Sequence, residues 1–217
     1  NLNTDTGNPE ATVDDESKNR VAKLTELPHR QDYAYFRRLF RFPTAPDDDF
    51  VTNFTNANKP TRSPINDTTE AYFHSGNLRV GTPWDVTAGE SVVVFVEGDL
   101  TVAAQTQVAQ GGFLAFIVSG DIVIDPSIGH ANPSITTPNV EGVFIGDGVF
   151  DTSNSALKFV GAGTFVGWSG VQLQRNFEDF SVNSSTPAEV FQYRPDFLLN
   201  APEAMKTPKY EWNEVNP

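Results

Sequence analysis

The sequence predicts an all-β protein, a parallel β-solenoid (β-helix) of about five 22-residue rungs with a short N-terminal helix and extended terminal arms. Three observations predict this fold. Gly-Asn/Asp-aliphatic motifs begin at Gly76, Gly98 and Gly120, and related glycines follow at Gly148 and Gly170. The residues between these marks also match, and short β-branched or aromatic runs alternate with glycine turns. A fixed period of this size is typical of stacked repeats.

Each period contains a long apolar strand and a shorter alternating strand. The long strands are expected at Ser91–Val96 and Phe113–Val118, and short ones at Leu100–Val102 and Ile122–Ile124. Stacking of the short strands predicts two columns of side chains in register: Leu78, Leu100 and Ile122 in the first, and Val80, Val102 and Ile124 in the second. An antiparallel sandwich is the alternative, but a constant 22-residue register is not expected of it.

The repeat divides the chain into four segments. Residues 71–173 form the predicted solenoid. Residues 1–28 are polar, which predicts a flexible or partner-dependent arm. Residues 29–70 are expected to hold the short helix and a connector or cap. Residues 174–217 form an aromatic, proline-rich arm, which should lie along a flank of the solenoid, over its C-terminal end, or on a neighbouring molecule.

The predicted helix lies within Arg30–Arg41 and has one aromatic face. Tyr33, Phe36 and Phe40 are spaced i, i+3 and i+7, and the arginines lie largely on the opposite side. A terminal rung needs a cover, so the helix is interpreted as a cap over the open end of the solenoid. The alternative is docking onto another subunit or an envelope partner, and these three aromatic residues are therefore candidate interaction residues.

Six additional residues interrupt the period within 126–140, where prolines and polar residues predict a projecting loop. Loops on rigid scaffolds often carry function, so His130 in this loop is a further candidate interaction residue. Neutral decoration is the equally open alternative. In the C-terminal arm the candidates are Phe191, Tyr193, Phe197 and Trp212, because exposed strand edges at the ends of a solenoid invite further pairing.

The sequence contains no pattern that indicates catalysis, a cofactor or a metal site. It has no cysteine and only three histidines, and it lacks phosphate-loop, nucleophile-elbow and zinc signatures. Asp99, Asp121 and Asp147 lie near the corner glycines, where turn residues are favoured over an acid–base pair. The run 47–49 of three aspartates could chelate Ca²⁺, but a solvated acidic turn is preferred because the glycine and distal glutamate of an EF-hand are missing.

The chain carries 15 basic and 28 acidic residues among 217, a formal net charge of −13. Such a surface repels phosphates, so nucleic acid and anionic lipid are not expected partners. Apolar runs such as Val92–Val96 are too short to cross a bilayer, so the chain is not expected to be an integral membrane protein. The expected partners are further copies of the chain, a surface glycan or an envelope protein.

Four stretches carry a resemblance to a known group: 76–173, Thr186-Pro-Ala-Glu189, Tyr193-Arg-Pro-Asp-Phe197 and Trp212-Asn-Glu-Val215. The chain resembles uncharacterised bacterial surface proteins of the candidate-phyla type, with a short β-solenoid and a PAE…YRPD…W-x-E-V ending. This resemblance implies an envelope or extracellular location and brings no activity. More loosely, the solenoid is similar to bactofilin-like and adhesin-like repeats, which polymerise or bind surfaces.

These observations predict a non-enzymatic extracellular structural protein, a self-assembling subunit of a surface filament or layer. The alternative is a carbohydrate-binding or carbohydrate-active β-helix, in which Trp84 or Trp168 should line a groove with aspartates. Because Trp168 aligns with Val96 by the 22-residue period, it is expected in the core or on a flank instead. An adhesin that recognises a protein through residues 126–140 is the third hypothesis.

Overall fold

The computed structural model describes residues 30–40, 58–60 and 71–206. The predicted arm 1–28, the aspartate run 47–49 and Trp212 lie outside the described residues. The chain divides into two units, residues 1–30 and 31–217, and the second contains every helix and strand described.

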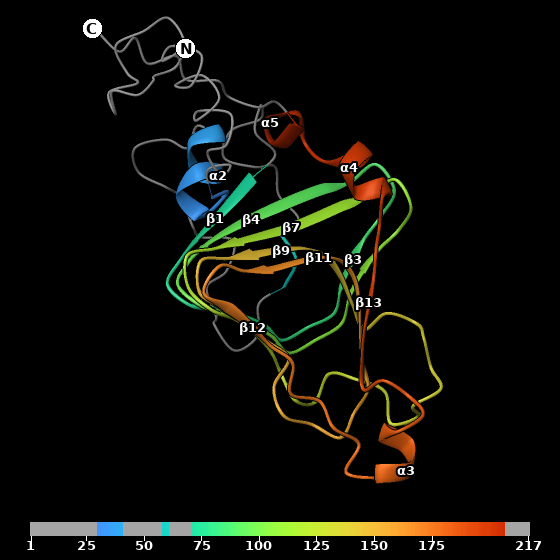
Figure 1. Cartoon of the computed structure of the whole chain (residues 1–217). Helices are drawn as coiled ribbons and strands as arrows, with labels where there is room; N and C mark the ends of the chain where they lie inside the picture. Colours follow the sequence, from blue (N-terminus) through green and yellow to red (C-terminus); the bar gives the residue numbers. More distant parts are fainter. Residues whose placement is uncertain (1–29, 41–57, 61–70, 207–217) are drawn as a thin grey trace, which may run out of the picture. The chain divides into compact units, whose positions relative to one another are not determined.

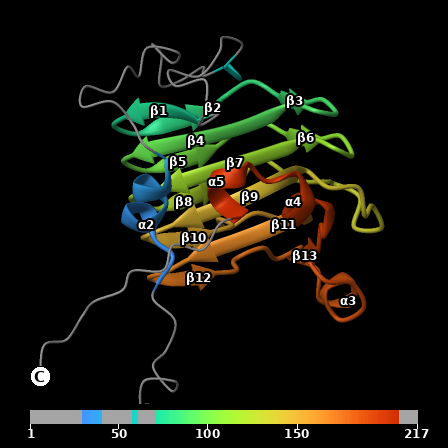
Figure 2. The same cartoon turned by 90° about the horizontal axis from the view of Figure 1, so that it is seen from above.

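The second unit is a parallel β-solenoid of about five turns, which confirms the predicted fold class (Figures 1 and 2). One sheet has the order β1-β4-β7-β9-β11-β13, with β3 and β6 attached, and the other has the order β2-β5-β8-β10-β12. The strands of the first sheet are β1 (Ala71–Ser75), β3 (Trp84–Val86), β4 (Ser91–Glu97), β6 (Thr106–Val108), β7 (Phe113–Val118), β9 (Val140–Gly146), β11 (Phe159–Gly167) and β13 (Glu189–Gln192). Those of the second are β2 (Leu78–Val80), β5 (Leu100–Val102), β8 (Ile122–Ile124), β10 (Val149–Asp151) and β12 (Gly170–Gln172).

The described residues include four short helices beside the sheets: α2 (Tyr33–Leu39), α3 (Phe180–Asn183), α4 (Asp196–Asn200) and α5 (Glu203–Lys206). The longest is α2, within the predicted range. Its N-terminus is capped by Asp32, whose carboxylate accepts a hydrogen bond from the Tyr35 amide at 2.9 Å. The helix ends at Phe40, which has extended backbone angles.

The predicted register is confirmed over the first three rungs. Leu78 pairs with Leu100 and Leu100 with Ile122, each 22 residues apart. The inserted loop raises the next interval to 28 residues, since Val118 pairs with Gly146.

The interval from the fourth rung to the fifth is 21 residues, and here the prediction is wrong. Val149, not Gly148, pairs with Gly170, and Gly167, not Trp168, follows Gly146 in the column of Val96. A Cβ atom on Gly167 would lie 2.2 Å from the Gly170 carbonyl oxygen, so only glycine fits this tight corner. Trp168 is consequently displaced outward and is 41% exposed.

An aromatic column fills the interior of the solenoid. The rings of Trp84, Phe116, Phe144, Phe165 and Phe191 follow one another along its length, with neighbouring centroids 5.1 to 5.3 Å apart. The Phe116–Phe144 and Phe144–Phe165 pairs are stacked nearly parallel, because each pair occupies matching positions of adjacent parallel strands. This column ties successive rungs together.

The repeated Asn/Asp residues form a ladder along one corner. Oδ1 of Asn77 accepts the amide of Asp99 at 2.8 Å, Oδ1 of Asp99 accepts that of Asp121 at 2.9 Å, and Oδ1 of Asp121 accepts that of Val149 at 2.7 Å. A Cβ atom on Gly120 would lie 2.1 Å from Oδ1 of Asp99, so the glycine before each acidic residue makes room for the preceding rung's side chain. The preferred turn interpretation of Asp99 and Asp121 agrees with this geometry.

Asp147 does not join this ladder. Its Oδ1 accepts a hydrogen bond from the Tyr33 amide at 2.9 Å, so this carboxylate fixes the start of α2 to the solenoid.

The inserted loop 126–140 is fastened to the following rung. His130 and Lys158 form an antiparallel β-bridge, and the buried Lys158 ammonium donates to the Pro133 carbonyl at 2.7 Å. The His130 ring lies 2.8 Å from the Thr137 carbonyl and 3.0 Å from the Asn139 side-chain amide. The loop therefore holds its own histidine inward and has a defined conformation.

Candidate functional site

The helix α2 lies across the outer face of the sheet of long strands and spans several rungs (Figures 1 and 2). Just before the helix, the Gln31 carbonyl accepts a hydrogen bond from the Trp168 indole of the last rung at 3.0 Å. At its other end, the Phe40 ring packs edge-on against Phe95 of the second rung at 5.3 Å. The helix was predicted to cover an open end of the solenoid, and this position is wrong. It covers a flank instead, because the outer face of this sheet is apolar.

Tyr33 lies at the start of this contact and packs edge-on against Phe95 at 5.8 Å. Burial raises the pKa of Tyr33 to about 12, and its buried hydroxyl has no hydrogen-bond partner among the described residues. Its ring therefore contributes packing, while its backbone amide bonds to Asp147.

The C-terminal arm returns to the same outer face. After β13 has paired with β11, the chain continues into α4 and α5, which lie on the side of the sheet occupied by α2. Phe197 of α4 is buried and contacts Phe113 edge-on at 6.1 Å. Both aromatic segments therefore pack, in their described parts, on their own solenoid.

Arg194 anchors this return. Its guanidinium donates two hydrogen bonds of 2.8 Å to Asp196, one of 3.1 Å to Glu141 and one of 3.2 Å to the Val108 carbonyl, and it lies 4.4 Å from the centre of the Phe197 ring. The hydrogen bond from Arg194 lowers the pKa of Asp196. The Tyr-Arg-Pro-Asp stretch noted in the sequence is therefore a clamp between the arm and the second and fourth rungs.

We expect Arg194→Ala to loosen α4 and α5 while the solenoid stays folded. The substitution removes a charge-assisted bidentate pair, and about 2 kcal/mol of local stability should be lost. Limited proteolysis should then cut within residues 196–206 faster than in the parent chain. Lys206→Ala is the matched control, because Lys206 is exposed and makes one bond, to the Leu199 carbonyl. Equal protease resistance of both variants would contradict the clamp.

The same clamp should respond to acid. The pKa of Asp196 is lowered in the folded chain, so its contribution is complete above the ordinary carboxylate value of about 4 and is lost as the pH falls through the lowered value. Protease cleavage of the arm should accelerate below about pH 4 in the parent chain and change less in Arg194→Ala.

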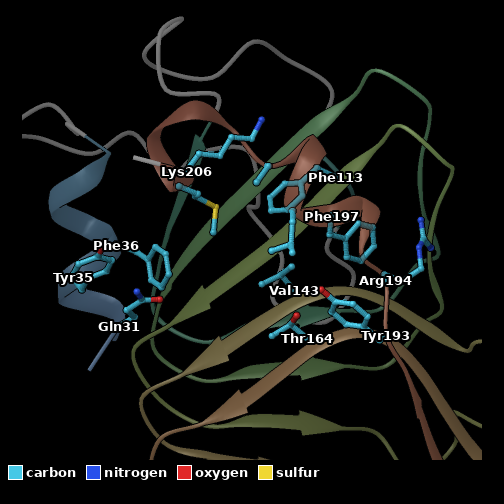
Figure 3. A pocket seen from close by; sticks show the side chains of 13 residues that line it. Gln31, Tyr35, Phe36, Phe113, Val143, Thr164, Tyr193, Arg194, Phe197 and Lys206 are labelled. Carbon is cyan, nitrogen blue, oxygen red and sulfur yellow. The ribbon is translucent and has the colours of Figure 1, made fainter. Parts of the chain in front are cut away.

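A cavity of about 430 Å³ remains on the outer face between α2 and the returning arm (Figure 3). Its walls are mainly apolar, and they include Phe36, Phe113, Val143, Phe197, Ala201 and Met205. The cations Arg194 and Lys206 also line it, but both already donate to groups of the chain. The cavity thus reflects incomplete contact between the two covering segments.

The C-terminal end of the solenoid differs from its flanks, because core side chains become exposed there. Val171 follows Phe150 in the column that begins at Leu78, yet it is 53% exposed. Leu173, the residue after β12, is 55% exposed, and Phe191 at the end of the aromatic column is 41% exposed. Among the described strands, β12 and β13 each pair with one neighbour only. Within the described residues, this end is a core with one side uncovered, and such an apolar composition is typical of obligate protein interfaces.

The eight predicted interaction residues separate into three groups. Tyr33, Phe36, Phe40 and Phe197 contact the chain's own core, and His130 is bonded within its own loop. Phe191 and Tyr193 are exposed. Trp212 lies outside the described residues.

Val171 and Leu173 were not among the interaction residues predicted from the sequence. Val171 joins the column of Leu78 through the 21-residue interval, whereas the 22-residue period places Gln172 there.

A second, more open cavity lies beside the inserted loop and is lined by Asp85, Gln107, Thr137 and Glu141, among others. It does not include the aromatic residues expected of a carbohydrate groove: Trp84 is fully buried in the core, and Trp168 bonds to the segment before α2. Within the described ranges, His, Asp and Glu side chains form no group of three placed to hold a metal ion.

No protein-family model, curated protein or solved structure matches this chain. Among its described helices, none is long and apolar enough to cross a membrane.

Proposed function

We propose that this protein is a non-enzymatic structural protein of the cell surface or extracellular space, and that it self-associates through the C-terminal end of its solenoid. One observation carries the proposal: at the C-terminal end of the stacked core columns, the side chains of Val171, Leu173 and Phe191 are exposed to solvent. Apolar side chains in such a row contribute about 25 cal/mol for each Å² that a partner removes from water. The edges of β12 and β13 that no described strand pairs add peptide groups that a further strand can bond.

The packing of α2 and of the described part of the C-terminal arm supports this choice of surface. Phe36, Phe40 and Phe197 are buried against their own sheet, so they contribute stability to the single chain. The glycan-binding alternative is less well supported, because Trp84 cannot serve as a stacking platform while it is fully buried. The extracellular location rests on the sequence resemblance alone.

The proposal predicts that a double substitution, Val171→Lys with Leu173→Lys, weakens self-association roughly 100-fold, because two apolar contacts are replaced by buried charges. Sedimentation equilibrium over a range of protein concentrations measures this dissociation constant. Both side chains are more than half exposed in the single chain, so the variant should keep its melting temperature.

Leu198→Lys with Leu199→Lys is the matched control. These residues are 67% and 78% exposed on α4, and the substitutions change the net charge equally. The control should associate like the parent chain. A parent chain that stays monomeric at high concentration, or a control that is equally weakened, would refute the proposed surface.

A further inference from the structure

The two ends of the solenoid are not equivalent. In the first rung, Leu78, Val80 and Trp84 are fully buried. The short segment 58–60 lies along this rung: Lys59 donates to the Asp85 carbonyl at 2.8 Å.

The same segment makes two further contacts with the first rung. Lys59 forms an ion pair with Glu90, and Asn58 accepts a hydrogen bond from Thr82 at 2.9 Å. The equivalent aliphatic position of the last rung, Val171, is 53% exposed. In the described part of the chain, the apolar core is thus covered at the N-terminal end and open at the C-terminal end.

This asymmetry restricts the assemblies that the chain can form. A head-to-tail filament joins the C-terminal end of one copy to the N-terminal end of the next, so it needs complementary apolar surface at both ends. An isologous contact needs one self-complementary surface, used by both copies, and it closes after two. Because only the C-terminal end exposes apolar core side chains among the described residues, we propose that two copies of this chain join by their C-terminal ends in a closed two-fold pair. This inference rests on the proposed self-association and adds its symmetry.

The secondary structure of the open end suits such a pair. Both β12 and β13 present an edge, and a two-fold axis across the end brings strands of the two copies together antiparallel. Antiparallel pairing needs no crossover connection, so it is accessible to two separate chains. Val171 and Leu173 of one copy would then cover the same residues of the other.

The formal charge of −13 per chain opposes this contact, since two copies of one charge meet. Added salt screens that repulsion and leaves the apolar contact in place. Association through this end should therefore strengthen, by a few-fold, as the ionic strength rises from about 0.05 to 0.3 M. A contact made chiefly of ion pairs would weaken over the same range.

The absence of cysteine allows a direct test of the symmetry in the full-length chain. Gln172→Cys places one thiol on the exposed last strand, and Ser75→Cys places one at the opposite end, on the first strand. In the closed pair, a flexible bismaleimide should cross-link Gln172→Cys to itself and leave Ser75→Cys monomeric on a denaturing gel. The double variant should give dimers and no longer chains. The sedimentation mass should reach twice the chain mass and stop there.

Each outcome decides a different statement. Long cross-linked chains in the double variant, with masses that keep rising, would overturn the closed pair and retain self-association through the ends. A monomer at every concentration, with no cross-link from either thiol, would overturn both the pair and the proposed function. That last result is also the one expected if the chain's own residues 207–217 covered the open end.

Discussion

Phe144→Ala is expected to lower the free energy of unfolding by about 3 to 5 kcal/mol, the usual cost of removing a buried phenyl ring. Phe144 is fully buried at the centre of the aromatic column, with the rings of Phe116 and Phe165 stacked on either side at 5.3 Å. The backbone of the parallel strands fixes these positions, so the neighbouring rings cannot close the space without disturbing the register. Urea unfolding followed by circular dichroism measures the loss.

Two control variants separate packing from general damage. Phe180→Ala removes the same ring at a position that is 88% exposed on α3, and should change stability by less than about 0.5 kcal/mol. Phe144→Leu fills part of the space and should cost clearly less than the alanine variant. If Phe144→Ala costs under about 1 kcal/mol, the column does not hold the rungs together as described.

The solenoid could be predicted because stacking places residues one period apart in the same environment, so the same residue types recur at that spacing. Leu78, Leu100 and Ile122 occupy one column, and the glycine before each acidic corner residue is required by the side chain of the rung below. Both requirements act between neighbouring rungs, so they recur at the period and are visible in one sequence.

The one-residue shortening of the last rung could not be predicted in the same way. Residues 161–170 contain glycines at 161, 163, 167 and 170, so more than one alignment places glycine on glycine. The choice depends on the tight approach of Gly167 to Phe150 and Gly170, which is a tertiary distance. Displacement of Trp168 from the core to the α2 contact follows from it.

The covering of the outer face had a signal that the sequence analysis did not use. Val92–Val96 and Phe113–Val118 are continuous apolar runs, and a strand with one solvated face would alternate instead. Continuous runs indicate that both faces are buried, so segments outside the repeat had to cover the flank.

The open C-terminal end had a signal in the sequence too, in the aliphatic residues Val171 and Leu173, which have no later repeat to cover them. The burial of Arg175 had no such signal in the sequence, because its guanidinium donates to backbone carbonyls, which every residue type provides.

Arg175→Met should have the second large effect, a loss on the order of 4 kcal/mol in unfolding free energy, because charge-assisted bonds to buried carbonyls are removed. The buried guanidinium donates to the carbonyls of Thr152 at 2.7 Å and Ile128 at 2.8 Å, and at longer distance to those of Asp125 and Pro126. These groups join the last rung to the start of the inserted loop. Without the guanidinium, the carbonyls of Thr152 and Ile128 lose this hydrogen-bond donor at a buried site.

The effect of this change should be localised, which distinguishes it from a general loss of packing. Hydrogen exchange should accelerate first at the His130 amide, which is bonded to the Lys158 carbonyl at 2.9 Å in the loop that Arg175 holds. The Phe116 amide, within the central strand β7, should be protected as in the parent chain until global unfolding. Lys206→Met, which removes one exposed bond to a carbonyl, should leave both amides unchanged. Uniform acceleration of both amides in Arg175→Met would show instead that the loop and the central rungs unfold as one unit.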